Sequence, residues 1–219
     1  MKRFTPFLKE SDFLLLDMDG TLLDKHFDDF FWEYFLPQKY AEKNNIPIEI
    51  SQKTLLEKYK KYEGTLKWTD INFWSKELDL DILSLKEEIQ HIIEKHPYVE
   101  EFLDNMKKKG KKLFLLSDAH YKSIELKLKK TDLGGYFDDI LSSFDVGFPK
   151  GDFRFWEKAE GRLGFKKEKS LFIDDIESIL KTAKDFGIRY LLFKATSNSK
   201  KEPNISKEFP KFHDFRELM

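Results

Sequence analysis

Short apolar runs, most of them followed at once by a polar residue, constrain the fold of this chain more than any other feature. Each run is continuous and not alternating, which is typical of strands buried on both faces of a parallel sheet. The runs are Phe13–Leu16 before Asp17, Leu113–Leu116 before Ser117, Ile140–Leu141, Leu171–Ile173 before Asp174, and Tyr190–Phe193. The chain is therefore expected to contain a parallel sheet whose strands end in polar side chains.

Helical patterns lie between these runs. Val99, Phe102, Leu103 and Met106 share one helical face, and Gly110 follows as a stop signal. Further helices are expected around Ile124–Leu128, at Phe153–Leu163 and at Ile176–Phe186. Alternation of strands and helices predicts an α/β fold with a Rossmann-like three-layer core around a parallel sheet.

The long segment between the first and second expected strands does not follow this alternation. Residues 25–95 contain no convincing strand but carry aromatic side chains at helical spacing, among them Phe27, Phe31, Trp68 and Trp74. We expect an inserted all-helical cap subdomain at residues 25–95 and a core domain made of residues 1–24 and 96–219. The polar stretch Ala195–Lys207 is expected to be a surface loop before a short terminal helix.

Composition excludes several classes of protein. The 219 residues include 39 basic and 40 acidic side chains, and this near-neutral balance argues against a dedicated nucleic-acid binder. The absence of cysteine excludes a disulfide scaffold, a cysteine zinc site and a thiol nucleophile. No apolar stretch approaches 18 residues, and the start has no secretory pattern. A cytoplasmic globular protein without a membrane partner is expected.

The segment after the first run carries the strongest chemical signal. Asp17 and Asp19 are followed by Gly20 and Thr21, and although Asp-Gly is a common turn dipeptide, no alternating partner strand follows to make a hairpin. Two carboxylates at the carboxyl end of a buried strand stand where open α/β sheets bind ligands. Such a carboxylate can ligate a hard cation or attack an electrophilic phosphorus.

Another buried run ends in Asp174 and Asp175. Adjacent acids repel one another without a cation between them, although either could instead cap the helix that follows. Ser117 ends a further run, where its alternative interpretation is a helix N-cap. Lys150 follows Pro149 in a loop and, taken alone, would be interpreted as an ordinary surface lysine. Two strands that both end in paired acids favour Mg²⁺.

The order of these motifs resembles the haloacid dehalogenase-like hydrolase superfamily. Asp-x-Asp-Gly-Thr, a strand-end serine, a loop lysine and a strand-end Asp-Asp follow one another across one α/β chain. The insert between the first two motifs resembles the helical cap of that superfamily. A narrower resemblance, to bacterial GMP/IMP nucleotidases, spans nearly the whole chain and includes Phe27–Trp32, Gly64–Trp68, Phe73–Asp81, Gly147–Lys150 and Leu171–Leu180.

The resemblance implies a Mg²⁺-dependent phosphatase that forms an aspartyl-phosphate. It implies Asp17 as the nucleophile and Asp19 as the general acid and base. The metal would be held by Asp17, the main-chain carbonyl of Asp19, and Asp175, with Asp174 joining directly or through water. Phosphate would be bound by Ser117 and Lys150 and by the turn at Gly20 and Thr21. Arg154 could grip phosphate or could equally be an exposed residue of a first helical turn.

The implied substrate is a purine nucleoside monophosphate. Trp68 or Trp74 could stack on its base, although the core of the cap is the more ordinary place for either ring. Asp118 stands where Asn is frequent in the superfamily and, if it does not bind phosphate, is expected to be turned away, protonated or paired. Ile176 stands where Ser is frequent. The alternatives are a phosphatase for a sugar phosphate or phosphoglycolate, a phosphomutase, and a binding protein with a relic site; the oligomeric state is not predicted.

Overall fold

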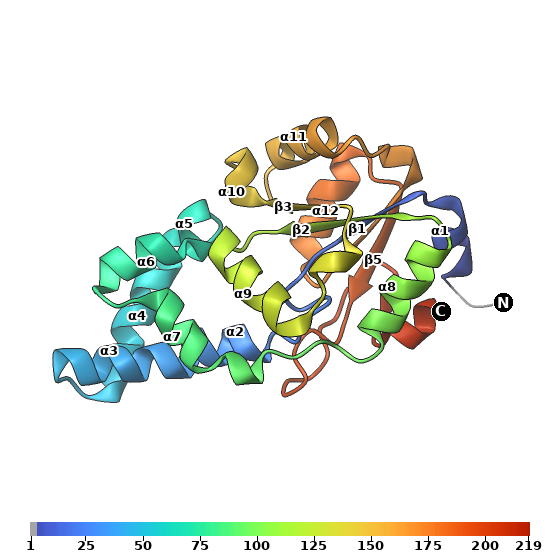
Figure 1. Ribbon diagram of the computed structural model, residues 1–219. Coiled ribbons are helices and arrows are strands. Elements are labelled where there is room, and N and C mark those ends of the chain that lie inside the picture. The colour runs from blue at the N-terminus through green and yellow to red at the C-terminus, as the bar shows by residue number, and fades with distance from the viewer. Residues whose placement is uncertain (1–3) are drawn as a thin grey trace.

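The computed structural model describes residues 4–219 and, within them, one sheet of six parallel strands. The strands lie in the order β3-β2-β1-β4-β5-β6 (Figure 1). They are β1 (Phe13–Leu16), β2 (Lys112–Ser117), β3 (Asp139–Ser142), β4 (Ser170–Asp174), β5 (Tyr190–Lys194) and β6 (Lys211–Phe212). Each of the five apolar runs is a strand, so the predicted parallel sheet is confirmed. The sixth strand has two residues, too few to produce a sequence pattern.

The central strand shows how the sheet is buried. Leu15 of β1 is in register with Phe114 of β2 and Phe172 of β4. Its neighbours Leu14 and Leu16 pack into the apolar cluster that contains residues of α8 (Val99–Lys108) and α9 (Tyr121–Thr131). The opposite face, including Leu15, packs with α11 (Phe153–Leu163) and α12 (Glu177–Phe186). Both faces are covered, which explains the continuous apolar runs and confirms the three-layer core.

The strand order reverses beside β1. The chain runs from β1 to β2 and β3 on one side, and then returns to β4 on the other side of β1. In open α/β sheets, ligands bind at the carboxyl ends of the strands where the order reverses. The residues that follow β1 and β4, beginning with Asp17 and Asp175, therefore occupy the position in this fold most suited to a functional site.

Residues 25–95 are helical and project from one side of the sheet (Figure 1). Trp74 lies at the centre of this part, fully buried, with its ring edge-to-face against those of Trp32, Tyr59 and Tyr62. The elements are α2 (His26–Phe30), the π-helix η1 (Phe31–Phe35), α3 (Leu36–Asn44), α4 (Ile48–Tyr62), α5 (Leu66–Thr69), α6 (Ile71–Leu78), α7 (Ile82–Glu88) and η2 (Gln90–Ile92). We call this part the cap.

The two segments that join the cap to the sheet pair with each other. Leu23 and Lys95 form an antiparallel bridge, the Asp24 N–H donates to the Glu94 carbonyl at 2.9 Å, and the His96 N–H donates to the Leu22 carbonyl at 2.9 Å. The chain thus enters and leaves the cap through one paired strip of backbone. The division into a core of residues 1–24 and 96–219 and a cap of residues 25–95 stays a prediction.

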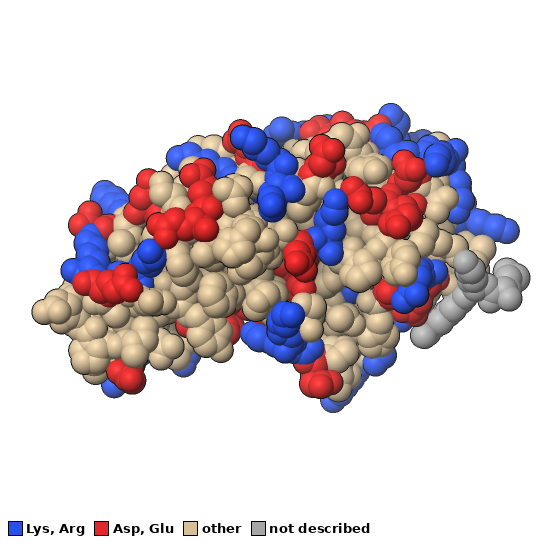
Figure 2. Space-filling view, turned by 60° about the horizontal axis from the view of Figure 1, so that its bottom comes forward, with Lys and Arg blue, Asp and Glu red and all other residues tan. Residues whose placement is uncertain are grey.

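Short elements complete the chain. They are α1 (Thr5–Glu10), η3 (Gly134–Tyr136), α10 (Ser143–Val146), η4 (Lys167–Lys169) and η5 (Phe215–Leu218). The expected terminal helix is η5, a 3₁₀ turn that begins with an Asp214 capping box, and the expected loop at 195–207 contains no helix or strand. In residues 4–219, no helix is both long and apolar enough to cross a membrane. Acidic and basic side chains are interspersed over the face shown in Figure 2.

Candidate active site

Asp17 stands immediately after β1 with one carboxylate oxygen bonded and the other free of protein partners. Its side chain is almost fully buried, and its main-chain N–H continues the sheet by donating to the Ile173 carbonyl at 3.0 Å. Oδ1 accepts a hydrogen bond from Lys150 Nζ at 2.5 Å. Oδ2 is buried and has no hydrogen-bond partner among the described residues. Such an atom is costly to bury unless a ligand completes its coordination.

Asp174 and Asp175 follow from the neighbouring strand β4. Asp174 is fully buried, and its Oδ2 accepts a second bond from Lys150 at 2.7 Å, while Oδ1 accepts the Ile176 N–H at 2.8 Å. Asp175 is different because neither of its buried carboxylate oxygens has a hydrogen-bond partner in residues 4–219. The Nζ of Lys25 lies 3.8 Å from its Oδ2. Asp175 therefore has two buried oxygens without a hydrogen-bond partner, and Asp17 has one.

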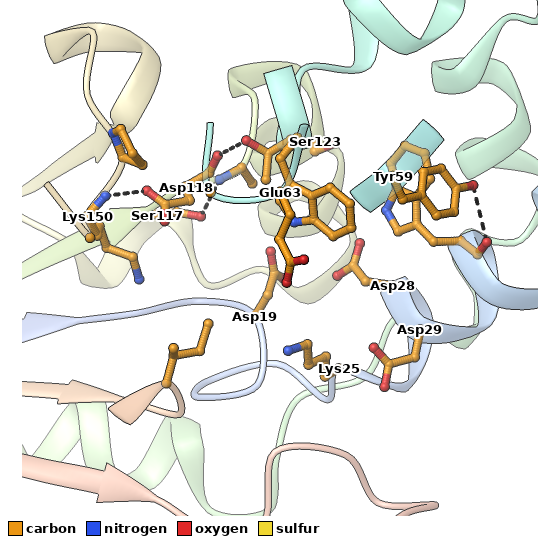
Figure 3. Close-up of a pocket in the computed structure, with 18 of the residues that line it drawn as sticks. Asp19, Lys25, Asp28, Asp29, Tyr59, Glu63, Ser117, Asp118, Ser123 and Lys150 are labelled. Atoms are coloured by element: carbon orange, nitrogen blue, oxygen red, sulfur yellow. Dashed lines mark hydrogen bonds between the residues drawn. The ribbon is translucent and has the colours of Figure 1, made fainter. Parts of the chain in front are cut away.

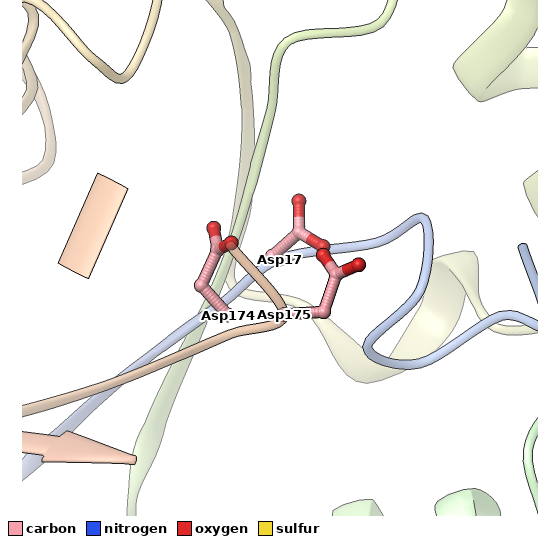
Figure 4. Close-up of side chains that lie close together, drawn as sticks. All are labelled: Asp17, Asp174 and Asp175. Atoms are coloured by element: carbon pink, nitrogen blue, oxygen red, sulfur yellow. The ribbon is translucent and has the colours of Figure 1, made fainter. Parts of the chain in front are cut away.

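These three carboxylates form a compact acidic cluster (Figure 4). One oxygen from each of Asp17, Asp174 and Asp175 lies within 4.8 Å of the others. Burial raises the pKa of Asp175 to about 7, with Lys25 opposing and Asp17 adding to the rise. Burial also raises the pKa of Asp174 well above its usual value. The cluster offers only oxygen ligands, three of which have no hydrogen-bond partner among the described residues, and burial disfavours the charged forms of Asp174 and Asp175. Such a cluster fits a hard divalent cation such as Mg²⁺.

Lys150 is held in place at both its backbone and its side chain. The main-chain N–H donates to Asp118 Oδ1 at 2.8 Å, and the carbonyl accepts Trp156 Nε1 at 2.9 Å. Burial by itself lowers the pKa of Lys150, but the carboxylates of Asp17 and Asp174 outweigh it and raise the pKa above the usual value. The ammonium group is therefore charged and buried between two carboxylates. The isolated interpretation of Lys150 as a surface lysine is wrong.

The turn after Asp19 brings the backbone against Asp175. Gly20 has a φ of +92°, and a Cβ there would lie 2.4 Å from Asp175 Oδ2. Only glycine fits this position, because both the conformation and the space exclude a side chain. Thr21 is fully buried, and its hydroxyl has no partner within the described part of the chain. Neither residue lines the pocket described below, so both support the site from behind.

Ser117 and Asp118 stand at the end of β2 and line the same pocket as Asp17. Ser117 Oγ accepts the Ala119 N–H at 3.1 Å. His120, and not Ser117, caps α9 by accepting the Lys122 N–H on Nδ1 at 3.3 Å, so the N-cap interpretation of Ser117 is wrong. Burial raises the pKa of Asp118, with Lys150 opposing. The expectation that Asp118 is paired is confirmed by its bond to the Lys150 backbone.

Arg154 is not brought to the other predicted residues. Its side chain is exposed, and its guanidinium donates to both carboxylate oxygens of Asp152, from Nε at 2.9 Å and from Nη2 at 2.5 Å. The same group packs over the Phe148 ring, 4.1 Å from its centroid. Arg154 does not line the pocket. It is the exposed residue of a first helical turn that the sequence allowed as an alternative.

Asp19 extends from the core toward the cap and has a cationic partner that the sequence motifs did not reveal. Lys127 of α9 donates from Nζ to Asp19 Oδ1 at 2.6 Å and to Asp28 Oδ2 of the cap at 2.5 Å. Burial raises the pKa of Asp19 to about 6, against the opposing charge of Lys127. Lys127 lies three residues after Ile124 and four before Thr131, both buried, so helical periodicity alone marked its position as inward.

A pocket of about 1300 Å³ connects these groups with the cap (Figure 3). Its core side includes Asp17, Asp19, Ser117, Lys150 and Asp175. Its cap side includes aromatic, acidic and polar residues, among them Trp32, Gln52, Tyr59, Glu63 and Trp68. The volume suits a ligand considerably larger than a phosphate group, since small-molecule sites occupy roughly 300–1,000 Å³. Every predicted site residue except Gly20, Thr21, Asp174 and Arg154 lines it.

The fold, the strand-end carboxylates and the buried lysine define a hydrolase with a Rossmann-like core and a helical insert after its first strand. Residues 12–187 match the family model described as haloacid dehalogenase-like hydrolase. This chain belongs to that family, as the order of its motifs predicted. Membership of the family explains why an acid pair, a serine and a second acid pair stand at strand ends, with a lysine in the loop before the last of these strands.

Relatives cover almost the whole chain. The GMP/IMP nucleotidase YrfG of Escherichia coli is 35% identical over 211 residues, which are 96% of this chain and 95% of the relative. A HAD phosphatase from Thermococcus onnurineus superposes with a TM-score of 0.80 at 24% identity, covering 94% of this chain and 95% of that one. A putative β-phosphoglucomutase from Thermotoga maritima superposes with a TM-score of 0.65 at 21% identity, over 90% and 88% of the two chains. The two structures share the fold with this chain, and the cap is included in the alignments.

Proposed function

We propose that this protein is a Mg²⁺-dependent phosphomonoester hydrolase that acts through an aspartyl-phosphate, with purine 5′-nucleotides as its substrates. One observation carries the proposal. Asp17 Oδ1 accepts a bond from Lys150, whereas Asp17 Oδ2 and both oxygens of Asp175 have no hydrogen-bond partner among the described residues. The two carboxylates belong to one cluster and line the same large pocket. A nucleophile, a fixed positive charge and an incomplete set of hard ligands thus lie at one point.

The two aspartates after β1 divide the chemistry between them. Asp17 would attack phosphorus, forming the acyl-phosphate bond as the bond to the ester oxygen breaks. Asp19, whose pKa of about 6 keeps part of it protonated near neutral pH, would give its proton to the leaving oxygen. The Asp19 carboxylate would then take a proton from the water that hydrolyses the intermediate. The products are an alcohol and inorganic phosphate, and both aspartates return to their first states.

The charge on the phosphoryl group requires cations around Asp17. Mg²⁺ held by Asp17, Asp175, Asp174 and the Asp19 carbonyl would supply neutralising charge between the nucleophile and the phosphate dianion. Lys150 Nζ, which binds Asp17, would stabilise the transferring oxygens, and Ser117 would donate its hydroxyl to them. Gly20 and Thr21 form the turn that allows Asp175 to approach. Arg154 has no place in this proposed site, because it lies outside the pocket.

The purine nucleotide is supported by the relative that covers the whole chain and by the shape of the cap. The chain is 35% identical to a GMP/IMP nucleotidase across the cap as well as the core. Trp68 lines the pocket with about 39% of its surface exposed, and Tyr59 packs edge-to-face against it. An exposed, fixed indole is a suitable platform for a purine base, whereas the fully buried Trp74 belongs to the cap core. A cytoplasmic location is part of this proposal.

A substrate panel tests the proposal. Purified protein with Mg²⁺ is given GMP, IMP, AMP, ribose 5-phosphate, phosphoglycolate and glucose 1-phosphate, and inorganic phosphate is measured with and without EDTA. Release from GMP and IMP well above release from the sugar phosphates supports a purine nucleotidase. A preference for a sugar phosphate or phosphoglycolate supports phosphatase activity but rejects purine nucleotides as the substrates. Conversion of glucose 1-phosphate to an isomer without phosphate release indicates a mutase, and no turnover of any ester rejects the proposal.

A further inference from the structure

A buried lysine links the proposed acid and base to the cap. Lys127 is only 2% exposed, and its Nζ donates to Asp19 Oδ1 at 2.6 Å and to Asp28 Oδ2 at 2.5 Å. Asp19 belongs to the turn after β1, Lys127 to α9 of the core and Asp28 to α2 of the cap. Figure 3 places Asp19 and Asp28 beside each other at the pocket. One ammonium group therefore holds a core carboxylate and a cap carboxylate together.

A second buried lysine completes this arrangement from the cap side. Lys86 of α7 is 2% exposed and donates from Nζ to Asp28 Oδ1 at 2.9 Å. Its ammonium also lies 4.5 Å from the centroid of the Phe31 ring and 4.9 Å from that of Phe27. Both oxygens of Asp28 are thus occupied by buried lysines. We call Asp19, Lys127, Asp28 and Lys86 the charge chain; it contains two carboxylates and two ammonium groups.

Stability alone is a poor reason for such a chain. Two of its members, Lys127 and Lys86, are almost fully removed from water, and the desolvation of buried charges roughly offsets their mutual attraction, so apolar residues of similar volume often stabilise a fold as well. What apolar residues cannot do is fix the direction of a carboxylate. Lys127 binds Oδ1 of Asp19, and no hydrogen bond from a described residue occupies Oδ2. Oδ1 of Asp19 is therefore held by Lys127, and Oδ2 is available to the reacting groups.

We propose that Lys127 is a positioning residue that aims the Asp19 carboxylate at the ester oxygen, and that its bond to Asp28 makes this aim depend on the position of the cap. The inference rests on the proposed function, because Asp19 is its proton donor. Lys127 acts through Asp19 and does not itself touch the substrate. When the cap moves away, Asp28 leaves with it, and Lys127 loses one of its two carboxylates. Asp19 is then held by a lysine that is no longer fixed from the cap side.

The test uses two esters that differ in their need for a proton. An alkyl leaving group such as a nucleoside requires protonation as it departs, whereas p-nitrophenolate departs without it. In single-turnover experiments with Mg²⁺, Lys127→Met is expected to slow nucleoside release by about 100-fold and nitrophenolate release by less than about threefold. Lys127→Arg, which keeps a donor for Asp19, is expected to recover at least about a tenth of the wild-type rate. The KM for the nucleotide should stay within about threefold of the wild-type value.

Matched variants separate positioning from folding. Asp19→Asn sets the reference, because direct loss of the acid must show the same dependence on leaving group. Lys194→Met removes another buried ammonium, which donates to the His213 carbonyl and does not line the pocket, and is expected to leave the ratio of the two rates unchanged. The proposal is overturned if Lys127→Met slows the release of nucleoside and of nitrophenolate by the same factor. It is also overturned if Lys194→Met changes the ratio of these two rates as much as Lys127→Met does.

A readout without turnover keeps the inference testable even if the phosphatase assignment fails. Crystal structures of Lys127→Met and of the more conservative Asp28→Asn show the Asp19 side chain directly. A rotated or disordered Asp19 carboxylate in Lys127→Met supports the proposal. An Asp19 that keeps its wild-type direction in both variants overturns it, whatever the enzyme hydrolyses. Lack of turnover in the wild-type protein, with Asp19 displaced in the variant, rejects the proposed function and keeps the positioning role.

Discussion

The core end and the cap end of the pocket differ in how far their side chains are buried and in how they are bonded. At the core end, Asp17 and Asp174 are buried and each accepts a hydrogen bond from the buried Lys150, at 2.5 and 2.7 Å, so Lys150 cannot move without leaving a buried charge uncompensated. At the cap end, Trp68 is partly exposed, and Glu63 is exposed. Under the proposed function, the core would perform the reaction with fixed charges, and the cap would recognise the leaving group through more exposed side chains.

The largest effect is expected at the core end, from Asp17→Asn. The amide cannot attack phosphorus, so phosphate release should fall by at least about 10⁴-fold. The fold should survive, because asparagine keeps the shape and an acceptor for Lys150 and removes repulsion within the acidic cluster. Steady-state kinetics and circular dichroism measure the two quantities. Retained turnover would mean that another residue is the nucleophile, and the contrast between the two ends would lose its chemical basis.

Removal of metal is expected to make the core end sensitive to pH. Burial raises the pKa of Asp175 to about 7 and that of Asp19 to about 6, so between pH 4 and 7 these two carboxyls bind more protons in the folded protein than in the unfolded chain. They outweigh His96, a single group whose pKa burial lowers to about 4. The free energy of unfolding in EDTA should therefore fall as pH rises through this window. Each net pKa unit by which the folded state differs from the unfolded state is worth about 1.4 kcal/mol, which lowers the melting temperature of a chain of this size by about 3–6 °C.

Added Mg²⁺ provides the control for that experiment. The cation replaces the protons on the carboxylates, so it should raise the melting temperature more at pH 8 than at pH 5. Scanning calorimetry at several pH values with Mg²⁺ or EDTA measures both trends. An increase in stability with pH in EDTA, or equal stabilisation by Mg²⁺ at both pH values, would contradict the assignment of a metal cluster to these aspartates.

A smaller effect is expected where the core end meets the loop of Lys150. Asp118 Oδ1 accepts the Lys150 main-chain N–H at 2.8 Å, and asparagine can accept the same bond. Asp118→Asn should therefore keep the turnover number within about threefold of wild type, whereas Asp118→Ala should lower it by about 10–100-fold, because the N–H loses a charge-assisted bond. If both variants lose activity equally, the carboxylate has a role beyond its bond to the Lys150 backbone.

The smallest effect is expected at the cap end. Trp68→Ala removes the proposed stacking surface, which is worth about 1 kcal/mol or slightly more, so KM for GMP should rise by about 10-fold with little change in the turnover number. Ribose 5-phosphate, which has no base, should show no change in KM. Tyr121→Ala provides a control, since it removes an exposed aromatic ring that does not line the pocket. An equal rise in KM for both substrates would show that Trp68 supports the cap and not the base.

Much of the fold could be predicted because its signals are local. Continuous apolar runs such as Leu171–Ile173 mark strands covered on both faces, and α11 has the bounds that its apolar spacing predicted. The shortest elements had no such signal: β6 has two residues and α1 six, fewer than periodicity needs. The placement of polar groups at strand ends was predictable for the same reason, since a strand end is visible in the sequence.

The partners of those polar groups were not predictable. Nothing local distinguishes the buried Lys150 from the exposed Arg154. For Lys127, helical spacing indicated an inward position but not its partners. Their difference arises from contacts more than a hundred residues apart for Lys150 with Asp17 and for Lys127 with Asp19. Asp28 was noticed only as part of a resemblance, and its two buried lysines come from α7 and α9.

The sequence by itself determined the order of the strands' polar ends, the residues available for catalysis and the presence of a helical insert. Each follows from short-range patterns that any single segment carries. The tertiary structure decided which carboxylate oxygens have a hydrogen-bond partner and which have none. It also decided that Asp175 packs where a side chain at position 20 would lie, and that Lys127 connects Asp19 with the cap. These are decided by distance in space, because burial and charge compensation depend on which segments meet once the chain has folded.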